Sequence, residues 1–261
     1  MRIVTWNINS LNARKDLAAA FLDEVKPDVL ALQELKLETD KVPREVFESR
    51  GFHVAIHGQK SWNGVLIASR LPQTDVVTGL DGDAGESRFI AATVDGIRFV
   101  NLYCPQGQNV ESEKFAYKLA FYDALIAKLG EVAKTAPNLV VLGDLNVAPE
   151  PDDVWDVSKF EGIPSYHPLE HQRWKRLLEV GLSDLVKPRV PSGTFSFWDY
   201  RGGDFRFNHG MRIDHVLGTA PVAGRVASAG VLRDWRKKRG EITPSDHAPV
   251  FVELAASGSP S

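Results

Sequence analysis

The segment Asn138-Leu139-Val140-Val141-Leu142-Gly143-Asp144-Leu145-Asn146-Val147-Ala148-Pro149 carries the strongest structural signal in the chain. Its apolar run, 139–142, has the length and composition of a buried strand. After a glycine come Asp144 and Asn146, which lie two positions apart and so project to the same side of an extended chain. Polar side chains at the carboxyl end of a buried strand often form a site in α/β proteins. A plain Asx turn explains the same residues, so a functional interpretation depends on other segments.

The composition indicates a globular protein with a large core. The chain has 261 residues, of which 43% are hydrophobic and 25% are charged, and its formal net charge is −3. This excludes a globally basic nucleic-acid binder, so phosphate binding would depend on a local basic patch or a metal ion. The single cysteine, Cys104, excludes an internal disulfide and fits a reducing compartment. Because we find no signal peptide and no apolar run of membrane length, we expect a cytoplasmic protein without membrane contact.

The first third of the chain predicts an α/β unit with polar strand ends. A strand over 3–6 ends in Asn7 and Asn9, and a helical repeat over 17–25 leads to a second strand that ends in Glu34. Taken alone, Glu34 is equally well an ordinary surface glutamate. Strand ends that meet at one edge of a sheet would bring these side chains together.

The middle of the chain predicts short strands and one long helix. Between residues 52 and 103, apolar runs separated by Gly and Asp turns indicate antiparallel strands in a meander. The last run ends at Tyr103 and enters a Pro/Gly loop that contains Gln106. The helix, at 112–134, has one apolar stripe, which indicates core packing.

The second half adds further elements without a linker that would divide the chain. They are a long ordered loop over 149–168, a helix over 169–180, an aromatic segment over 195–201, a strand over 211–217 that contains Asp214, and a last strand over 250–254 that follows Asp246 and His247. We expect one domain over residues 1–254, with two sheets inside and helices outside, and a disordered tail over 255–261.

The polar residues near the predicted strand ends suggest metal-assisted chemistry. They are Asn7, Asn9, Glu34, Tyr103, Asp144, Asn146, Asp214, Asp246 and His247. Carboxylates and amides are typical of Mg²⁺ sites, and the absence of cysteine from the set argues against structural zinc. A carboxylate such as Asp214 could orient His247 to donate or shuttle a proton. The chain has no Gly-x-Ser-x-Gly elbow, which argues against a nucleophilic serine.

Several motifs are similar to those of a known superfamily. Three of them, 32–34 (Leu-Gln-Glu), 143–146 (Gly-Asp-Leu-Asn) and 245–247 (Ser-Asp-His), resemble signatures of the endonuclease/exonuclease/phosphatase superfamily. More local stretches resemble the exonuclease III family of bacterial abasic-site endonucleases: 6–11, 57–60, 103–107, 195–201 and 212–214. The resemblance extends from Ile3 to about Leu254, with the motifs in the expected order.

The resemblance implies a fold, an activity and a substrate. The fold would be a four-layer α/β sandwich, with two packed mixed β-sheets flanked by helices. The activity would be Mg²⁺-dependent hydrolysis of DNA phosphodiesters, with Mn²⁺ able to substitute, 5′ to abasic sites and 3′ to 5′ from duplex ends. The partner would be double-stranded DNA with abasic sites or recessed 3′ ends, bound by a monomer.

The resemblance also implies roles for individual residues. Glu34 would be the principal metal ligand, with Asn7 and Asp246 near the ion or its waters. Asp144 would activate or orient the attacking water, and Asn146 would hold that water or the phosphate.

The remaining catalytic roles concern proton donors. His247, oriented by Asp214, would donate to a non-bridging oxygen, and Tyr103 would contact the phosphate. Donors of this kind stabilise the charge that develops on phosphate oxygens. The sequence leaves open whether Asp144, His247 or Tyr103 is the general base.

Substrate binding falls to another group of residues. The resemblance assigns it to Asn9, Gln106, Phe197, Trp198, Met211, Arg212 and Ile213. The apolar members would form a pocket for a deoxyribose without its base, and Gln106 would enter the duplex. We place Phe195 in the sheet core and prefer the pocket over the core for Trp198.

Basic residues and rival functions complete the set of expectations. Arg201, Arg206 and Arg212 are candidates for phosphate contacts, whereas the cluster over 233–239 is equally well a solvated face. The nearest alternative is a phosphoesterase of the same superfamily that acts on inositol phosphates or phospholipids. A catalytically silent DNA-binding module is the alternative from another class, and an active Glu34→Gln variant would support it.

Overall fold

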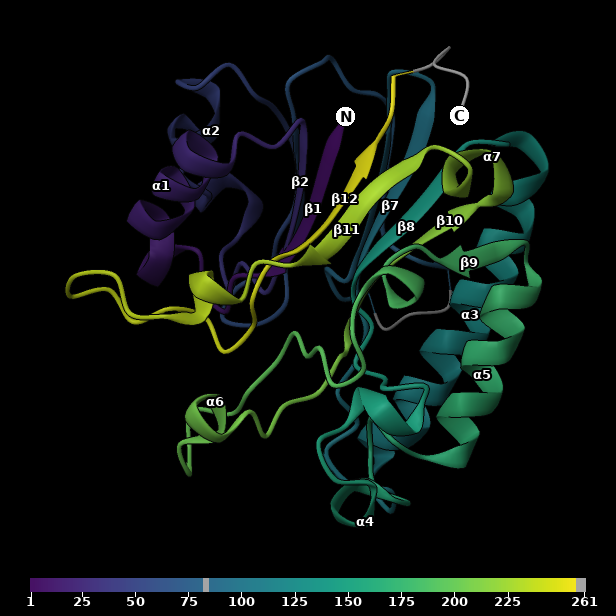
Figure 1. Cartoon of the computed structure of the whole chain (residues 1–261). Helices are drawn as coiled ribbons and strands as arrows, with labels where there is room; N and C mark the ends of the chain where they lie inside the picture. The colour runs from purple at the N-terminus through teal and green to yellow at the C-terminus, as the bar shows by residue number, and fades with distance from the viewer. Residues whose placement is uncertain (82–84, 257–261) are drawn as a thin grey trace.

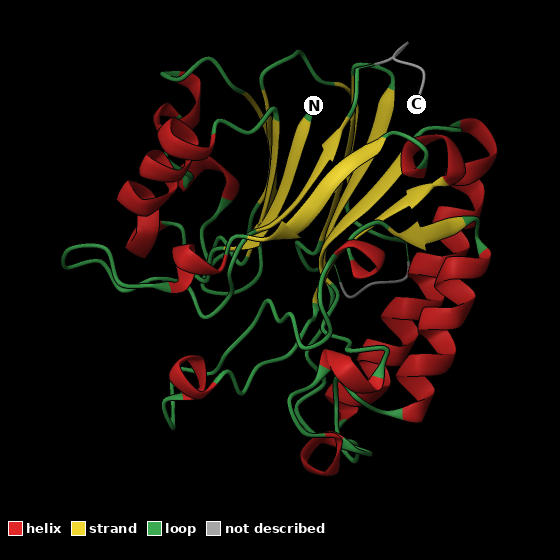
Figure 2. Ribbon diagram, in the orientation of Figure 1, coloured by secondary structure: helices red, strands yellow, loops and turns green. Residues whose placement is uncertain are grey.

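The computed structural model describes residues 1–81 and 85–256, and within them two six-stranded β-sheets pack face to face (Figures 1 and 2). Helices cover the outer face of each sheet, so the order of layers is helix, sheet, sheet, helix. This confirms the predicted α/β sandwich. No helix in the described part of the chain is both long and apolar enough to cross a bilayer. Of the predicted tail, residues 257–261 lie outside the described residues.

The first sheet contains strands from both ends of the chain, in the order β11-β12-β1-β2-β4-β3. Their bounds are β1 Arg2–Asn7, β2 Val29–Gln33, β3 His53–His57, β4 Val65–Ser69, β11 Val226–Val231 and β12 Val250–Leu254. Helix α1 (Lys15–Val25) connects β1 to β2, which run parallel, and α2 (Glu45–Glu48) precedes β3. The N-terminal and C-terminal strands therefore pair directly, β1 with β12.

The second sheet has the order β5-β6-β7-β8-β10-β9. Its strands are β5 Thr74–Thr78, β6 Phe89–Val94, β7 Ile97–Tyr103, β8 Leu139–Asp144, β9 Leu182–Asp184 and β10 Asp214–Thr219. Its outer helices are α3 (Glu113–Thr135) and α5 (Pro168–Glu179). Short helices α4 (Val157–Phe160), α6 (Asp204–Phe207) and α7 (Ala220–Ala223) lie in the connections, as do 3₁₀ turns at Asn12–Arg14, Thr39–Lys41, Pro151–Asp153, Lys187–Arg189 and Arg233–Arg236.

The predicted meander between residues 52 and 103 is divided between the two sheets. Strands β3 and β4 join the first sheet, where β4 pairs with β2, whereas β5, β6 and β7 form a meander in the second. The chain crosses from one sheet to the other between Ser69 and Thr74. Local turn signals are the same for both arrangements, because partner choice depends on contacts that are distant in sequence.

The two sheets follow the same pairing pattern. Among the described strands, each sheet has one parallel pair, β1 with β2 and β7 with β8, and its other neighbours are antiparallel. A helix on the outer face connects each parallel pair, as parallel strands require. The carboxyl ends of these four strands point to the same edge of the sandwich (Figure 1).

The core between the sheets is apolar and closed. It includes Ile3, Val29, Ile67, Ile90, Phe99, Val140, Leu142, Val216 and Val252, each at most 1% exposed. Separate apolar clusters pack α1 against the first sheet and α3 and α5 against the second. Burial on this scale fixes strand registers, and hence which strand-end residues face each other.

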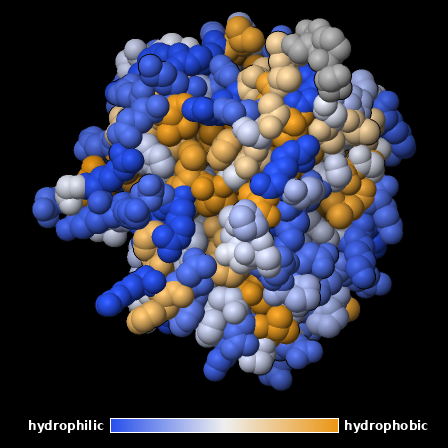
Figure 3. Space-filling model, viewed as in Figure 1, coloured by the Kyte–Doolittle hydropathy of each residue, from blue (hydrophilic) through white to orange (hydrophobic). Residues whose placement is uncertain are grey.

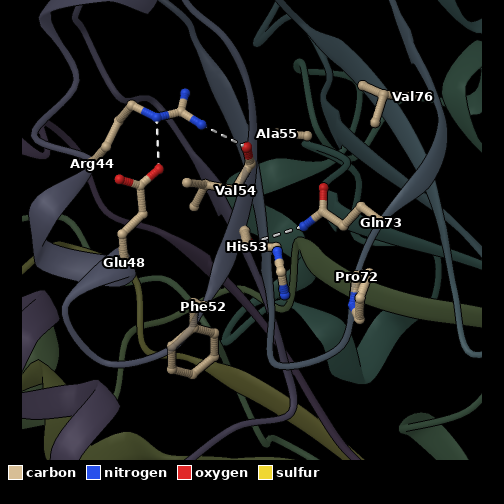
Figure 4. Close-up of a pocket in the computed structure, with 9 residues that line it drawn as sticks. All are labelled: Arg44, Glu48, Phe52, His53, Val54, Ala55, Pro72, Gln73 and Val76. Carbon is tan, nitrogen blue, oxygen red and sulfur yellow. Dashed lines mark hydrogen bonds and ion pairs between the residues drawn. The ribbon is translucent and has the colours of Figure 1, made fainter.

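The free edge of β3 is covered by side chains (Figure 4). Arg44 Nη2 donates to Val54 O (3.1 Å) on this edge and is held by Glu48, whereas Gln73 Nε2 donates to His53 O (3.0 Å) and to Ile67 O (3.0 Å) between β3 and β4. Capped carbonyls do not template pairing with another strand. The shallow cavity beside them, about 540 Å³, is therefore explained by edge protection.

We predict that Gly143→Ala destabilises the protein and that Gly130→Ala does not. A Cβ on Gly143, whose φ is +141°, would lie 2.0 Å from Leu102 O on the paired strand, whereas a Cβ on Gly130 in α3 meets nothing within 4 Å. We expect a loss of about 3 kcal/mol for the first and a gain of about 0.5–1 kcal/mol for the second, measured by urea unfolding. Equal stabilities for the two variants would contradict the close approach of β7 and β8.

Candidate active site

The strand ends of both sheets converge on one place. Asn7 ends β1 and Glu34 follows β2, while Tyr103 and Asp144 end β7 and β8 and lie opposite each other in register. Asp214 begins β10 directly opposite Asp144. Packing of the two sheets therefore brings together residues from five strands.

The side chain of Asn7 joins the two halves of the site. Its Nδ2 donates to Glu34 Oε1 (2.8 Å) and to Asp144 Oδ2 (2.9 Å), and Asn7 is fully buried. Its Oδ1 accepts from the backbone N–H of Asn9 (3.0 Å). The amide thus lies between two carboxylates that would otherwise repel each other. Its two N–H bonds fix the positions of Glu34 Oε1 and Asp144 Oδ2.

Local backbone geometry directs the polar side chains. Glu34 and Asn146 both have left-handed conformations, with φ of 53° and 50°. Asp144 Oδ1 accepts from the backbone N–H of Asn146 (3.0 Å), which is the Asx turn that the sequence allows. The Asx turn therefore does not replace the functional interpretation, because the turn itself places Asp144 and Asn146 in the lining of the cavity. Glutamate at positive φ is uncommon and costs about 1–3 kcal/mol, a strain typical of functional positions.

The segment 245–247 is attached to the end of β1. Ser245 Oγ donates to Asn7 O (2.6 Å) and accepts from the backbone N–H of His247 (3.1 Å). Trp6 Nε1 donates to His247 O (3.1 Å). These bonds place His247 beside the strand ends although it is distant from them in the sequence.

His247 is held as a charged donor between two carboxylates. Its Nδ1 lies 2.8 Å from Asp214 Oδ2, which also accepts from Ser196 Oγ (2.6 Å), and its Nε2 lies 3.8 Å from Asp144 Oδ2. Burial alone would lower the pKa of the imidazole, but the Asp214 and Asp144 carboxylates raise it to about 10. Burial raises the pKa of Asp144 to about 7 against the opposing effect of the imidazolium.

Tyr103 is a neutral phenol at this edge. Burial raises its pKa well above the usual value, and the nearby carboxylates of Glu34 and Asp144 act in the same direction. The guanidinium of Arg88 lies 4.9 Å from the centre of its ring. A partly buried, protonated hydroxyl that lines the cavity is suited to donating a hydrogen bond to an anionic oxygen.

The rim of the site carries Asn9 and Asp246. Asn9 Nδ2 donates to Asp246 Oδ1 (2.9 Å), and Asn9 Oδ1 accepts from Lys36 Nζ (2.6 Å). Lys36 Nζ also lies 3.1 Å from Glu34 Oε2. One lysine thus links the rim to the carboxylate in the interior.

Three side chains could hold a metal ion. Glu34, Asp144 and His247 each offer a ligand atom, and these atoms lie within 4.8 Å of one another. Two carboxylates beside an amide fit a hard, oxygen-preferring cation. His247 Nδ1 is bound to Asp214, so Nε2 is the atom that the imidazole offers to an ion or to a phosphate oxygen. The residues present therefore fit a divalent ion, whose identity the geometry leaves open.

A cavity of about 310 Å³ opens over these groups. It is lined by Glu34, Tyr103, Gln106, Asp144, Asn146, Phe160, Ile163, Pro164, Ser165, Phe197, Met211, Ile213, Asp246 and His247. The lining combines charged and polar groups with apolar side chains. Polar groups that converge on a partly apolar cavity are typical of a ligand or substrate site.

Comparison with known proteins agrees with this geometry. The model of the Endonuclease/Exonuclease/phosphatase family matches residues 4–247. The chain belongs to this family. Exodeoxyribonuclease III of Haemophilus influenzae is 32% identical to it, over 97% of this chain and 100% of that protein. The chain is therefore a nuclease of the exonuclease III and AP endonuclease group.

Solved structures of the family have the same fold. A 3′ phosphatase from Neisseria, bound to a product DNA hairpin, is 38% identical with a TM-score of 0.94, covering 98% of this chain and 100% of that one. An AP endonuclease from Archaeoglobus fulgidus is 35% identical with a TM-score of 0.92, again covering 98% and 100%. The match over nearly the whole length confirms the predicted family.

Part of the cavity wall in this family member was missed in the sequence. Phe160, Ile163, Pro164 and Ser165 all come from the connection over 149–168, which the sequence predicts as an ordered loop. No periodicity marks individual residues in this loop. Its density of Pro and aromatic residues was the available signal, and it pointed to the loop as a whole.

The structure corrects the prediction for Trp198. This side chain is 1% exposed, packs with Phe195 and Ala248, and is not among the described residues that line the cavity. Its Nε1 donates to Asn208 Oδ1 (3.2 Å). The neighbouring Phe197 lines the cavity instead, because successive residues of an extended segment point to opposite sides. Phe195, as predicted, lies in the core.

The structure also corrects the prediction that Arg212 contacts substrate phosphate. The side chain is 2% exposed, and its guanidinium donates to Asp153 Oδ1 (2.7 Å) and Asp184 Oδ2 (2.6 Å). It also contacts His215 Nδ1 (3.0 Å). Arg212 therefore fixes the segment that carries Met211 and Ile213, and does not face the solvent.

The arginines of the 233–239 cluster make contacts within the protein. Arg233 stacks 4.1 Å from the ring centre of Phe205, Arg236 Nη2 donates to Trp198 O (3.2 Å), and Arg239 pairs with Glu24. The loop between β11 and β12 that follows this cluster projects at the left of Figure 3 and is mostly hydrophilic. These arginines therefore attach the segment before the loop to the rest of the protein. The sequence predicts phosphate contacts or a solvated face for them, and neither includes this role.

We predict that Arg212→Met costs about 3 kcal/mol of stability, because it leaves the partly buried Asp184 without its arginine and the buried Asp153 with Lys187 alone. The control is Arg201→Met, whose side chain is 89% exposed and pairs only with Asp199 among the described residues; it should stay within about 0.5 kcal/mol of the wild type. Urea unfolding measures both. An Arg212→Met variant with normal stability and weakened DNA binding would restore the original assignment.

Proposed function

We propose that the protein is a Mg²⁺-dependent DNA repair nuclease that cleaves phosphodiesters 5′ to abasic sites and removes nucleotides from recessed 3′ ends. The observation that carries this proposal is the Asn7 bridge between Glu34 and Asp144, two carboxylates that line a partly apolar cavity together with His247. The relatives named exodeoxyribonuclease III, AP endonuclease and 3′ phosphatase support a phosphate ester in DNA as the substrate.

Glu34 would be the principal ligand of the ion. Its carboxylate is oriented by Asn7 and Lys36, and Asp246, which lines the same cavity, would hold the ion's waters. When bound, Mg²⁺, or Mn²⁺ in its place, would neutralise charge on a phosphate oxygen. The protein's contribution is a fixed carboxylate at the inner end of the cavity.

Asp144 is the residue that we assign to accept the proton of the attacking water. Its Oδ2 is directed by Asn7 and its Oδ1 by the backbone of Asn146, so the carboxylate cannot rotate freely. His247 and Tyr103 are both protonated in this environment, which suits them to donate. Asn146, anchored by its Nδ2 to Cys104 O (2.9 Å), would orient the water or the phosphate.

The donors would stabilise the transition state. His247, held by Asp214, and Tyr103 would donate to non-bridging oxygens as negative charge develops there. Removing one such donor typically costs about 100- to 1000-fold in rate.

The apolar wall would select the substrate. Phe197, Met211 and Ile213 face the catalytic groups and suit a deoxyribose that has lost its base. Gln106 also lines the adjoining groove, so it lies where a duplex would cross. An inositol ring would need hydrogen-bonding partners on this wall, which its apolar side chains do not provide.

We predict that Glu34→Gln lowers cleavage of an abasic duplex by about 100-fold or more and that EDTA abolishes cleavage by the wild type. Labelled duplexes with an abasic analogue or a recessed 3′ end, resolved on gels, measure both activities, and the incision product should carry a 3′-hydroxyl. Glu38→Gln is the matched control, because Glu38 pairs with Lys41 on the surface. Cleavage that persists in chelator would refute the metal assignment.

A further inference from the structure

A buried ion pair lies next to the site but takes no part in the proposed chemistry. Lys118 on α3 pairs with Glu170 on α5, and both side chains are fully buried. Removing two charges from water is costly, and apolar side chains of similar volume often stabilise such a position equally well. The pair therefore calls for an explanation other than stability.

The ammonium of Lys118 joins three segments. Besides Glu170, its Nζ contacts Asn146 O (2.7 Å) and Gln106 O (3.2 Å). A lysine has three N–H donors, and here each has an acceptor on a different part of the chain. Two of these acceptors belong to residues that line the cavity.

The carboxylate of Glu170 fixes another wall of the cavity. Its oxygens accept from the backbone N–H groups of Ser165 (3.1 Å) and His167 (3.1 Å). Ser165 lines the cavity, and its carbonyl accepts from the backbone N–H of Ala148 (2.8 Å). The wall is thereby connected to the segment that follows Asn146.

The space around the pair allows little adjustment. A Cβ on Gly107 would lie 3.2 Å from Lys118 Cδ, 3.2 Å from Phe115 Cδ2 and 3.4 Å from Pro164 Cβ. The loop that carries Gln106 and Gly107 is thus packed between α3 and Pro164. A change at Lys118 would be transmitted to both loops, since tightly packed groups move together.

We propose that Lys118 and Glu170 are positioning residues. They set the distance between the loop that carries Asn146 and the two walls of the cavity that carry Gln106 and Ser165. Lys118 acts on the rate of hydrolysis through Asn146, and Glu170 acts on substrate binding through Ser165. This inference rests on the proposed function of the site. Displacements of about 1 Å caused by remote changes can lower a rate by about 100-fold.

The kinetic test uses Lys118→Met and Glu170→Gln on a duplex with one abasic analogue. We expect kcat to fall by about 10- to 100-fold in Lys118→Met with a smaller change in KM, and KM to rise more than kcat falls in Glu170→Gln. Lys134→Met, at an exposed position of the same helix, is the matched control and should leave both constants unchanged.

Two further variants separate positioning from folding. The double variant Lys118→Met/Glu170→Leu replaces the pair with apolar side chains but removes the four backbone hydrogen bonds that the pair makes, so we expect a lower melting temperature and a kcat that stays low at temperatures far below it. Leu125→Ala, in the core face of α3, should lower the melting temperature and keep kcat at temperatures far below it. A double variant with normal stability and normal kcat would overturn the proposal.

A measurement without substrate distinguishes this proposal from the proposed function. Hydrogen exchange of the Ser165 and His167 amides should be faster in Glu170→Gln and in the double variant. If the wild type cleaved no abasic duplex, the proposed function would fail, yet faster exchange would still support positioning. Unchanged exchange at both amides would overturn the positioning role by itself.

Discussion

The site depends on one amide group that two carboxylates share. Asn7 Nδ2 donates to Glu34 from the first sheet and to Asp144 from the second, so the bond pair forms only when the sheets pack in this register. Two carboxylates this close would repel each other, and each would be costly to bury unpaired. The amide reduces that cost, and both carboxylates line the cavity.

The repeated pairing pattern explains why these residues meet. Each sheet contains one parallel pair among its described strands, and the carboxyl ends of parallel strands share an edge. In register, Asn7 lies opposite Gln33 and Tyr103 lies opposite Asp144, so Asn7 and Tyr103 are equivalent positions of the two sheets. When the two sheets pack together, these edges meet and form one site. The first sheet contributes an amide at Asn7 and the second contributes a phenol at Tyr103 and a carboxylate at Asp144.

The sequence predicted the strand ends better than the walls. Glu34 and Asp144 follow buried apolar runs, and such runs are local signals; helix α3, predicted over 112–134, was found at Glu113–Thr135. The prediction for Trp198 was wrong because the segment over 195–201 is irregular. Its sequence does not show which residues point to the cavity and which point to the core. Arg212 was misplaced because its carboxylate partners are 28 and 59 residues away. Neither property can be read from neighbouring residues.

Buried ion pairs fix the positions of the segments around the site, whereas apolar packing fixes the sheets. His247 pairs with Asp214, Arg212 with Asp153 and Asp184, and Lys118 with Glu170, and each pair joins segments that follow different strands. The large apolar clusters lie between the sheets and under the helices, where they fix the strands, whereas the described loops have only two small clusters, around Met211 and around Trp198. An ion pair with directed hydrogen bonds specifies one loop arrangement, whereas an apolar contact of equal strength permits several. A hydrolase that must align a water, a phosphate and a proton acceptor gains from that restriction, because a misplacement of the order of 1 Å can lower the rate by about 100-fold.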